Sequence, residues 1–304
     1  MKKKFFSLIL LSLFFLFLIF PETVQAGAKE GLALWYNTMI PILFPFILIS
    51  NLLIATDSVR YFTYPIIPLL RWFPYLNPYY FYALIFGWFC GYPMGAKSIA
   101  DLLRTGKITK QEANFLLPAV NQASPMFLIG YLGIHIFEKS YSFGQILLII
   151  YGPVLFFLIS GLFLFNPSKN ERILAPSYKK NSMSLSMEHT IISSFQIMVN
   201  IGVYMMIFTI LMRLLLLLLP ESPLLTLFIG FLEMSTGIAW IHHLSFLTPF
   251  VKGSLIFALT AFGGFCTMAQ TYSVTEGLHL SIPFYLVAKI LLGTLSFCMA
   301  FYLL

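Results

Sequence analysis

Apolar residues in this chain gather into long runs separated by short polar segments. Charge-free runs of spanning length cover 31–56, 72–96, 113–137, 141–166 and 253–275. Further apolar runs, each with at most one charge, lie near 191–219, 224–241 and 282–304. A helix that crosses the hydrocarbon core needs about 20 apolar residues, so the pattern predicts an all-α polytopic membrane protein with about eight or nine membrane elements.

The composition favours the lipid bilayer as the solvent. Hydrophobic residues make up 59% of the 304 positions and charged residues 10%, with a mean hydropathy of +0.89. The net charge of +7 is spread over short loops, which argues against nucleic acid as a partner. Cys90, Cys266 and Cys298 lie in apolar runs without metal-ligand spacing, so no metal or cofactor is expected. The sequence is compatible with a homo-oligomer.

Basic residues predict the topology. Residues 1–26 have the form of either a cleavable secretory signal or a first transmembrane helix, and both alternatives place Gly27 outside the cell. The linker 167–187 is rich in lysine and is predicted to be cytoplasmic. It divides the chain into a first membrane repeat, 27–166, and a second, 188–304. A re-entrant hairpin, with arms at 79–90 and 97–105, would place a second basic group on the same side.

The first break in an apolar run contains Gly91, Tyr92, Pro93, Gly95 and Lys97. Glycine and proline at membrane depth leave backbone groups without helical partners, and a bound solute can supply the missing bonds. A short helix that starts here, with Lys97 in its first turn, would favour an anionic solute. The alternative is a proline kink that shapes packing, with Lys97 reaching to the interface.

The second break contains Asn121, Gln122 and Ser124, and it follows a helix that Thr109 and Glu112 predict through a capping box. Adjacent amides inside a span either contact the solute or bond neighbouring helices. Both interpretations stay open from the sequence.

In the second half, Glu233 is an acid within an apolar run and precedes Ser235 and Thr236. An ionisable group at that depth is a functional candidate, here for proton or sodium coupling, and the alternative is a neutral glutamic acid bonded to another helix. Gly263, Gly264 and Gln270 form a last break. The pattern Phe-Gly-x-Phe-Cys occurs at 86–90 and 262–266, and paired interrupted segments indicate a solute site between two repeats.

The segments 91–97, 100–102, 106–113 and 121–130 together resemble the YlbJ family of sporulation integral membrane proteins. The resemblance implies a nucleoside-recognition or Gate domain, related to concentrative nucleoside transporters, and movement of dipicolinic acid across the outer forespore membrane. This chain departs from the family at Gln122, Ala123 and Ser124, where Asn-Ser-Gly is common, and after the double glycine, where Phe265 and Cys266 stand in place of a polar position. The departures leave the substrate open.

The sequence thus predicts a secondary transporter of the bacterial cell membrane for a small anionic solute, dipicolinate-like by resemblance. Its expected partners are that solute and the lipid bilayer. The alternatives are a sporulation membrane scaffold or assembly factor, and a nucleoside-type permease. An enzyme is not expected, because no hydrolase, Walker A or Rossmann motif is present.

Overall fold

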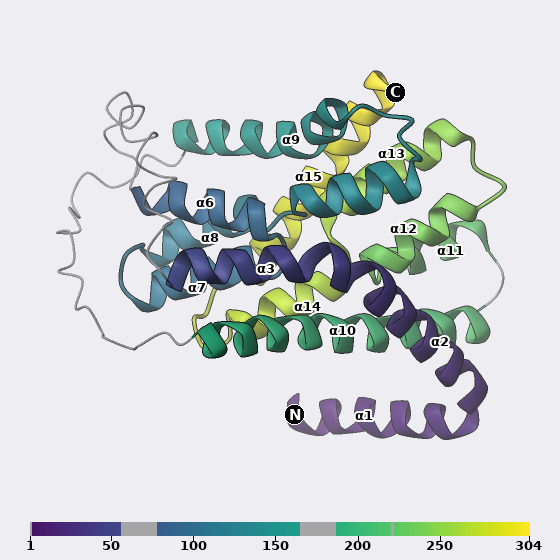
Figure 1. The fold of residues 1–304 in the computed structure, drawn as a ribbon. Helices are drawn as coiled ribbons and strands as arrows, with labels where there is room; N and C mark the ends of the chain where they lie inside the picture. The colour runs from purple at the N-terminus through teal and green to yellow at the C-terminus, as the bar shows by residue number, and fades with distance from the viewer. Residues whose placement is uncertain (1, 56–77, 165–186, 220–221) are drawn as a thin grey trace.

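The computed structural model describes residues 2–55, 78–164, 187–219 and 222–304, which form helices and no strand (Figure 1). Many large apolar side chains, such as Phe156 and Tyr302, are exposed on the outside, as expected for a surface that faces lipid. The predicted all-α, multi-pass membrane protein is therefore confirmed. Within the described residues, five stretches are long and apolar enough to cross a membrane: Pro21–Ile49, Phe143–Gly161, Thr190–Leu218, Pro249–Val274 and Ile282–Leu303.

The chain begins with α1 (Lys2–Ile19) and α2 (Pro21–Leu34), which continues through a π-helical turn, η1 (Trp35–Met39), into α3 (Ile40–Ala55). Glycines let α2 lie directly on the long helix α10 (Met187–Leu218), because a Cβ added to Gly27 would be 2.8 Å from the Ile210 Cα. The proposed boundary after residue 26 falls inside α2, and cleavage there stays a prediction.

A helical hairpin lies where the sequence predicted one, formed by α6 (Pro78–Cys90) and α7 (Met94–Arg104) with its tip at residues 91–93, and its re-entry into the membrane stays a prediction. We call it the first hairpin. Its arms touch through glycines, because a Cβ on Gly87 would be 3.1 Å from the Gly95 Cα. Tyr92 and Pro93 are joined by a cis peptide bond at the tip.

Next comes an interrupted helix. Its first part, α8 (Lys110–Val120), starts with the predicted capping box, in which Thr109 and Glu112 bond each other's backbone amides. The helix stops at Asn121 and resumes as the π-helical η3 (Phe127–Ile136). The long helix α9 (Phe143–Leu164) follows. We call the interruption at 121–125 the first junction.

The second half presents the same order of elements. A long helix, α10 (Met187–Leu218), precedes the second hairpin, made of α11 (Pro223–Gly230) and α12 (Met234–His243). An interrupted helix, α13 (Pro249–Phe262) with α14 (Gly264–Val274), and a long helix, α15 (Ile282–Leu303), complete it. We call the meeting of the second hairpin's tip with the turn at 263–264 the second junction. The limits of the two repeats stay a prediction, which this order supports.

The two hairpins enter the bundle from opposite ends, as the positions of α6 and α7 and of α11 and α12 show (Figure 1). The basic turn after α7 lies at the same end as the close of α9 and the start of α10 (Figure 1). That arrangement agrees with a common cytoplasmic side for both basic groups, although most of the linker 167–187 lies outside the described residues.

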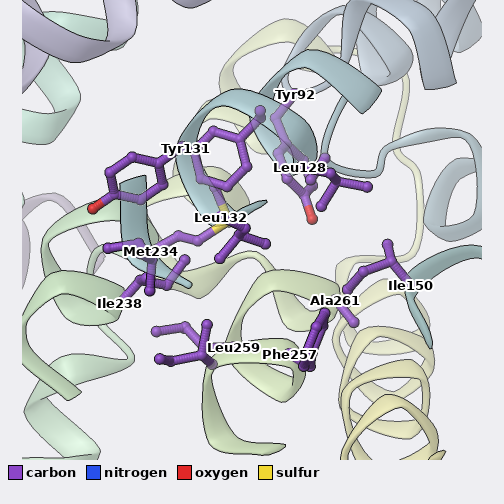
Figure 2. Packing of buried hydrophobic residues seen from close by; sticks show 14 of the residues in the cluster. Tyr92, Leu128, Tyr131, Leu132, Ile150, Met234, Ile238, Phe257, Leu259 and Ala261 are labelled. Carbon is purple, nitrogen blue, oxygen red and sulfur yellow. The ribbon is translucent and has the colours of Figure 1, made fainter. Parts of the chain in front are cut away.

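The main apolar core lies where these elements meet. Figure 2 shows side chains of η3, α12 and α13 packed together, among them Leu128, Tyr131, Met234, Ile238, Phe257 and Leu259. The Tyr131 hydroxyl donates to the Ser235 carbonyl at 2.7 Å, which ties η3 to α12. The core thus holds the interrupted helices against the hairpin tips.

Candidate functional site

Both hairpin tips and both interrupted helices border one pocket of about 40 Å³. Polar side chains of both hairpin tips and both interrupted helices line it: Tyr92, Ser124, Glu233, Thr267 and Gln270. Much of the remaining wall is apolar and includes side chains of η1, α3 and α10. This volume accommodates roughly three water molecules. In the described conformation, the pocket is therefore smaller than an organic solute.

The first hairpin's tip is pressed against the first junction. Gly91 has a φ of +74°, which favours glycine, and an added Cβ would lie 2.9 Å from the Ser124 amide nitrogen. A Cβ on Gly95 would lie 2.5 Å from the Val120 carbonyl oxygen. Glycine at these positions lets two backbones meet, so Gly91 and Gly95 shape the site by allowing this approach.

Asn121 is completely buried and bonds three different elements. Its side-chain oxygen accepts from the Ala96 amide of α7 at 3.3 Å. Its side-chain nitrogen donates to the Thr271 hydroxyl at 2.8 Å and to the Tyr285 hydroxyl at 2.9 Å. The Ala96 amide in the first turn of α7 thus already has a hydrogen-bond acceptor, and the Asn121 side chain links α7, α14 and α15 in this conformation.

Lys289, which the sequence patterns did not indicate, is a buried basic residue that bonds residues of the first hairpin and the first junction without lining the cavity itself. Its side chain projects from the middle of α15 and is completely buried. The ammonium donates to the Asn121 carbonyl at 3.0 Å, to the Gln122 side-chain oxygen at 3.1 Å and to the Tyr92 hydroxyl at 3.4 Å. It also lies 5.1 Å from the centre of the Tyr92 ring.

Glu233 stands at the tip of the second hairpin and faces the cavity. Its carboxylate caps α12 by accepting the Thr236 amide at 2.6 Å, so the local role of this acid is to end the hairpin turn. The Thr236 hydroxyl pairs with the Thr209 hydroxyl of α10 at 3.2 Å. Ser235 lines the cavity beside Glu233.

Backbone hydrogen bonds hold the second junction together. The amides of Phe265 and Cys266, at the start of α14, donate to the carbonyls of Phe231 and Leu232 at 3.1 and 2.8 Å. Gly263 and Gly264 have φ values of +92° and +77°, which make the sharp turn before α14. These glycines therefore build the second junction without lining the cavity.

The predicted site residues fall into two groups. Those lining the cavity are Gly91, Tyr92, Ser124, Glu233, Ser235 and Gln270. Those lying elsewhere are Pro93, Gly95, Lys97, Asn121, Gln122, Thr236, Gly263 and Gly264. Among the second group, Asn121 and Gln122 contact Lys289 or its partners, and the half-buried Lys97 side chain is absent from the wall.

Two further observations bear on possible ligands. Within the described residues, no group of three His, Cys, Asp or Glu side chains is placed to hold a metal ion. A larger hollow of about 350 Å³ lies outside the centre, between the end of η3 and α13, where Glu138, Tyr141, His242 and Lys252 line it. None of the predicted site residues borders this hollow.

The fold and the site define a multi-pass helical membrane protein whose buried polar centre is made of discontinuous helices. The chain is similar to the sporulation integral membrane protein YlbJ of Bacillus subtilis (strain 168), with 30% identity over 137 residues. The match covers 43% of this chain and 34% of that relative. No protein-family model matches the chain, and no solved structure matches it. The likeness thus links part of the chain to a sporulation membrane protein.

Proposed function

We propose that this protein is a secondary transporter that moves a small anionic solute. The observation that carries the proposal is the meeting of two oppositely directed hairpins and two interrupted helices around one pocket whose wall includes Glu233 and other polar side chains. In transporters built from repeats, discontinuous helices of this kind form the solute and ion sites near the bilayer midplane. A helical bundle that spans a membrane for support alone needs no such interruptions.

Two buried ionisable residues support the proposal. Glu233 and Lys289 are 3% and 0% exposed and lie near the interruptions. Charged groups inside a membrane are costly, and they commonly mark paths for ions or solutes. The ammonium of Lys289 supplies the positive charge that an anionic solute requires. The resemblance to sporulation membrane proteins suggests a dicarboxylate such as dipicolinate, and Glu233 is the proposed coupling residue.

The alternative function is a membrane scaffold in sporulation. It is favoured by the small cavity and by the fact that, in the described part of the chain, every buried side-chain nitrogen and oxygen has a hydrogen-bond partner. In a scaffold, the interruptions would serve packing and the basic linker would bind a partner protein. A catalytic role forms no part of either proposal.

The test is uptake of labelled dipicolinate into proteoliposomes, with a labelled nucleoside as the second solute. Glu233→Gln keeps a side chain that can accept the Thr236 amide but removes the titratable acid, so we expect normal insertion and at least about tenfold slower uptake. The matched control is Glu276→Gln, since Glu276 is an exposed acid that should leave uptake unchanged.

Saturable uptake of dipicolinate by the wild type, lost in Glu233→Gln and kept in Glu276→Gln, would support the carrier. Uptake of the nucleoside instead would move the proposal to a nucleoside permease. Correctly folded protein that moves neither solute under any imposed ion gradient would contradict both and favour the scaffold.

A further inference from the structure

The ammonium of Lys289 occupies an unusual place for a lysine. It lies at the first junction, beside the end of α8, where the helix stops and its last carbonyls lose their helical partners. Among the described residues, no carboxylate forms an ion pair with it. Its three hydrogen-bond partners are a backbone carbonyl, a side-chain amide oxygen and a phenol oxygen, all of them neutral.

Such a set of neutral oxygens also suits a hard cation, because carbonyl, amide and hydroxyl oxygens are the ligands that hard ions prefer. Lysines inside a membrane pair with acids or with backbone carbonyls, and all three partners of Lys289 are uncharged oxygens of the kind that a metal ion could share. In transporters with interrupted helices, the unwound carbonyls and the carboxyl ends of half-helices coordinate sodium. The end of α8 has both features, because its dipole is negative there and the Asn121 carbonyl is free of helical bonds.

The neighbouring groups hold these oxygens in place for a cation. The Gln122 side-chain nitrogen donates to the Pro118 carbonyl at 2.6 Å, which turns the amide oxygen toward Lys289. The Tyr92 hydroxyl donates its proton to the Thr260 carbonyl at 2.8 Å, so its oxygen can act only as an acceptor toward the Lys289 ammonium. Both oxygens are thereby fixed as acceptors.

We propose that Lys289 is a tethered substitute for a coupling cation, filling the place at the first junction that a sodium ion would otherwise take. The inference rests on the proposed transport function and deepens it. The covalent tether to α15 keeps the charge at the junction through the transport cycle, so movement of the anionic solute needs no sodium. It also joins the first half of the chain to its last helix through a buried charge.

The proposal predicts a gain of cation dependence. Lys289→Ala removes the ammonium and most of its stem, leaving the Asn121 carbonyl and the Gln122 oxygen without a donor beside an open space. Sodium or methylammonium can then enter. Lys289→Met fills that space with an apolar chain of similar length and leaves no room for a cation.

The experiment measures thermal unfolding of purified protein in sodium, methylammonium or N-methyl-D-glucamine chloride at equal ionic strength. We expect the midpoint of Lys289→Ala to rise by roughly 5 °C in sodium or methylammonium relative to the large organic cation. The wild type and Lys289→Met should show no such difference. Lys252→Ala is the matched control, because the Lys252 ammonium also donates to a carbonyl, at 3.1 Å, but beside the outer hollow.

A wild type that sodium stabilises would overturn the proposal, since the site would then not be filled by the lysine. The proposal would also be overturned if Lys289→Ala folds but no cation raises its unfolding midpoint, or if cations raise the midpoint of Lys289→Met as much as that of Lys289→Ala. If Lys289→Ala does not fold, the cation response of the wild type still decides. Thermal unfolding requires no solute movement, so a negative result in this experiment is distinct from a negative result in the uptake test of the transport proposal. Where uptake is measured, replacing sodium should change the wild-type rate less than about twofold.

Discussion

The two junctions satisfy their freed backbone groups in different ways. At the first junction, carbonyls accept from side chains of other elements: those of Ala119, Asn121 and Ala123 accept from Trp88, Lys289 and Tyr151, respectively. At the second junction, the carbonyls of Phe231 and Leu232 accept directly from backbone amides of α14.

The difference indicates which junction can change its bonding. The side-chain donors belong to α6, α9 and α15, so a substitution can remove or replace each donor without moving a backbone. Backbone donors require two segments to separate as units. We therefore expect the first junction to be sensitive to the chemistry of its side chains, and the second to be sensitive to the volume between its backbones.

The largest expected effect tests the close backbone contact in the second hairpin. A Cβ at Gly237 would lie 1.8 Å from the Gly230 carbonyl oxygen, so Gly237→Ala must push the hairpin arms apart. We expect a loss of about 3 kcal/mol in the free energy of unfolding, or a fall of roughly 5–10 °C in the unfolding midpoint. Gly144→Ala is the control, because nothing lies within 4 Å of its added Cβ. Equal unfolding midpoints for Gly237→Ala and Gly144→Ala would contradict the close approach of Gly237 to the Gly230 carbonyl.

An intermediate effect is expected at the first junction. Asn121→Ala removes the acceptor for the Ala96 amide and the donor to Thr271 and Tyr285. Buried groups that lose their partners cost about 1–3 kcal/mol each, although the two hydroxyls can still bond each other at 3.4 Å. We expect a total loss of about 2 kcal/mol, measured by thermal or denaturant unfolding. The exposed Asn200 provides the control variant Asn200→Ala, which should cost less than about 0.5 kcal/mol.

The smallest expected effect concerns the bridge between the junctions. The Tyr92 hydroxyl donates to the Thr260 carbonyl of α13 and accepts from Lys289, so Tyr92→Phe removes one link between the halves. We expect a loss of about 1 kcal/mol in unfolding free energy, because the ring and its packing remain. Tyr302→Phe, at a residue 86% exposed, should change nothing measurable. A stabilised Tyr92→Phe protein would argue that the hydroxyl is poorly paired.

The sequence predicted the interruptions well because local composition determines them. Glycine and proline at 91–95, the amides at 121–122 and the capping box before α8 all act within a few residues of themselves, and the structure has breaks or caps at each. Glu233 was singled out because it is an acid in an apolar run. The all-α membrane fold follows from the lengths of those runs.

The contacts between residues far apart in the sequence could not be predicted from local sequence patterns. Lys289 is an ionisable residue in an apolar run just as Glu233 is, and the same rule applied to it would have placed it among the candidates. Its contact with Gln122, however, joins residues 167 positions apart, which no local pattern encodes. Lys97 was selected because it neighbours the break in sequence, but the helical turn that follows carries its side chain away from the cavity wall.

The repeated Phe-Gly-x-Phe-Cys pattern pairs segments that differ in structure. Its first copy ends α6 at the first hairpin, and its second copy ends α13 at the turn into α14. By order of elements, the counterpart of the first hairpin is α11 with α12, where Glu233 lies. The pattern pointed to interrupted segments without pairing the corresponding ones, since a five-residue match carries no information about fold order.

The bond between Gln122 and Lys289 also has a consequence for biogenesis. A ribosome that adds about 5–20 residues per second needs about 10–30 s to proceed from one of these residues to the other. Throughout that interval, the amides and carbonyls of the first junction lack their lysine. We expect a chain truncated before α15 to be retained by the insertion machinery and degraded, because the first junction then never receives the hydrogen bonds of Lys289.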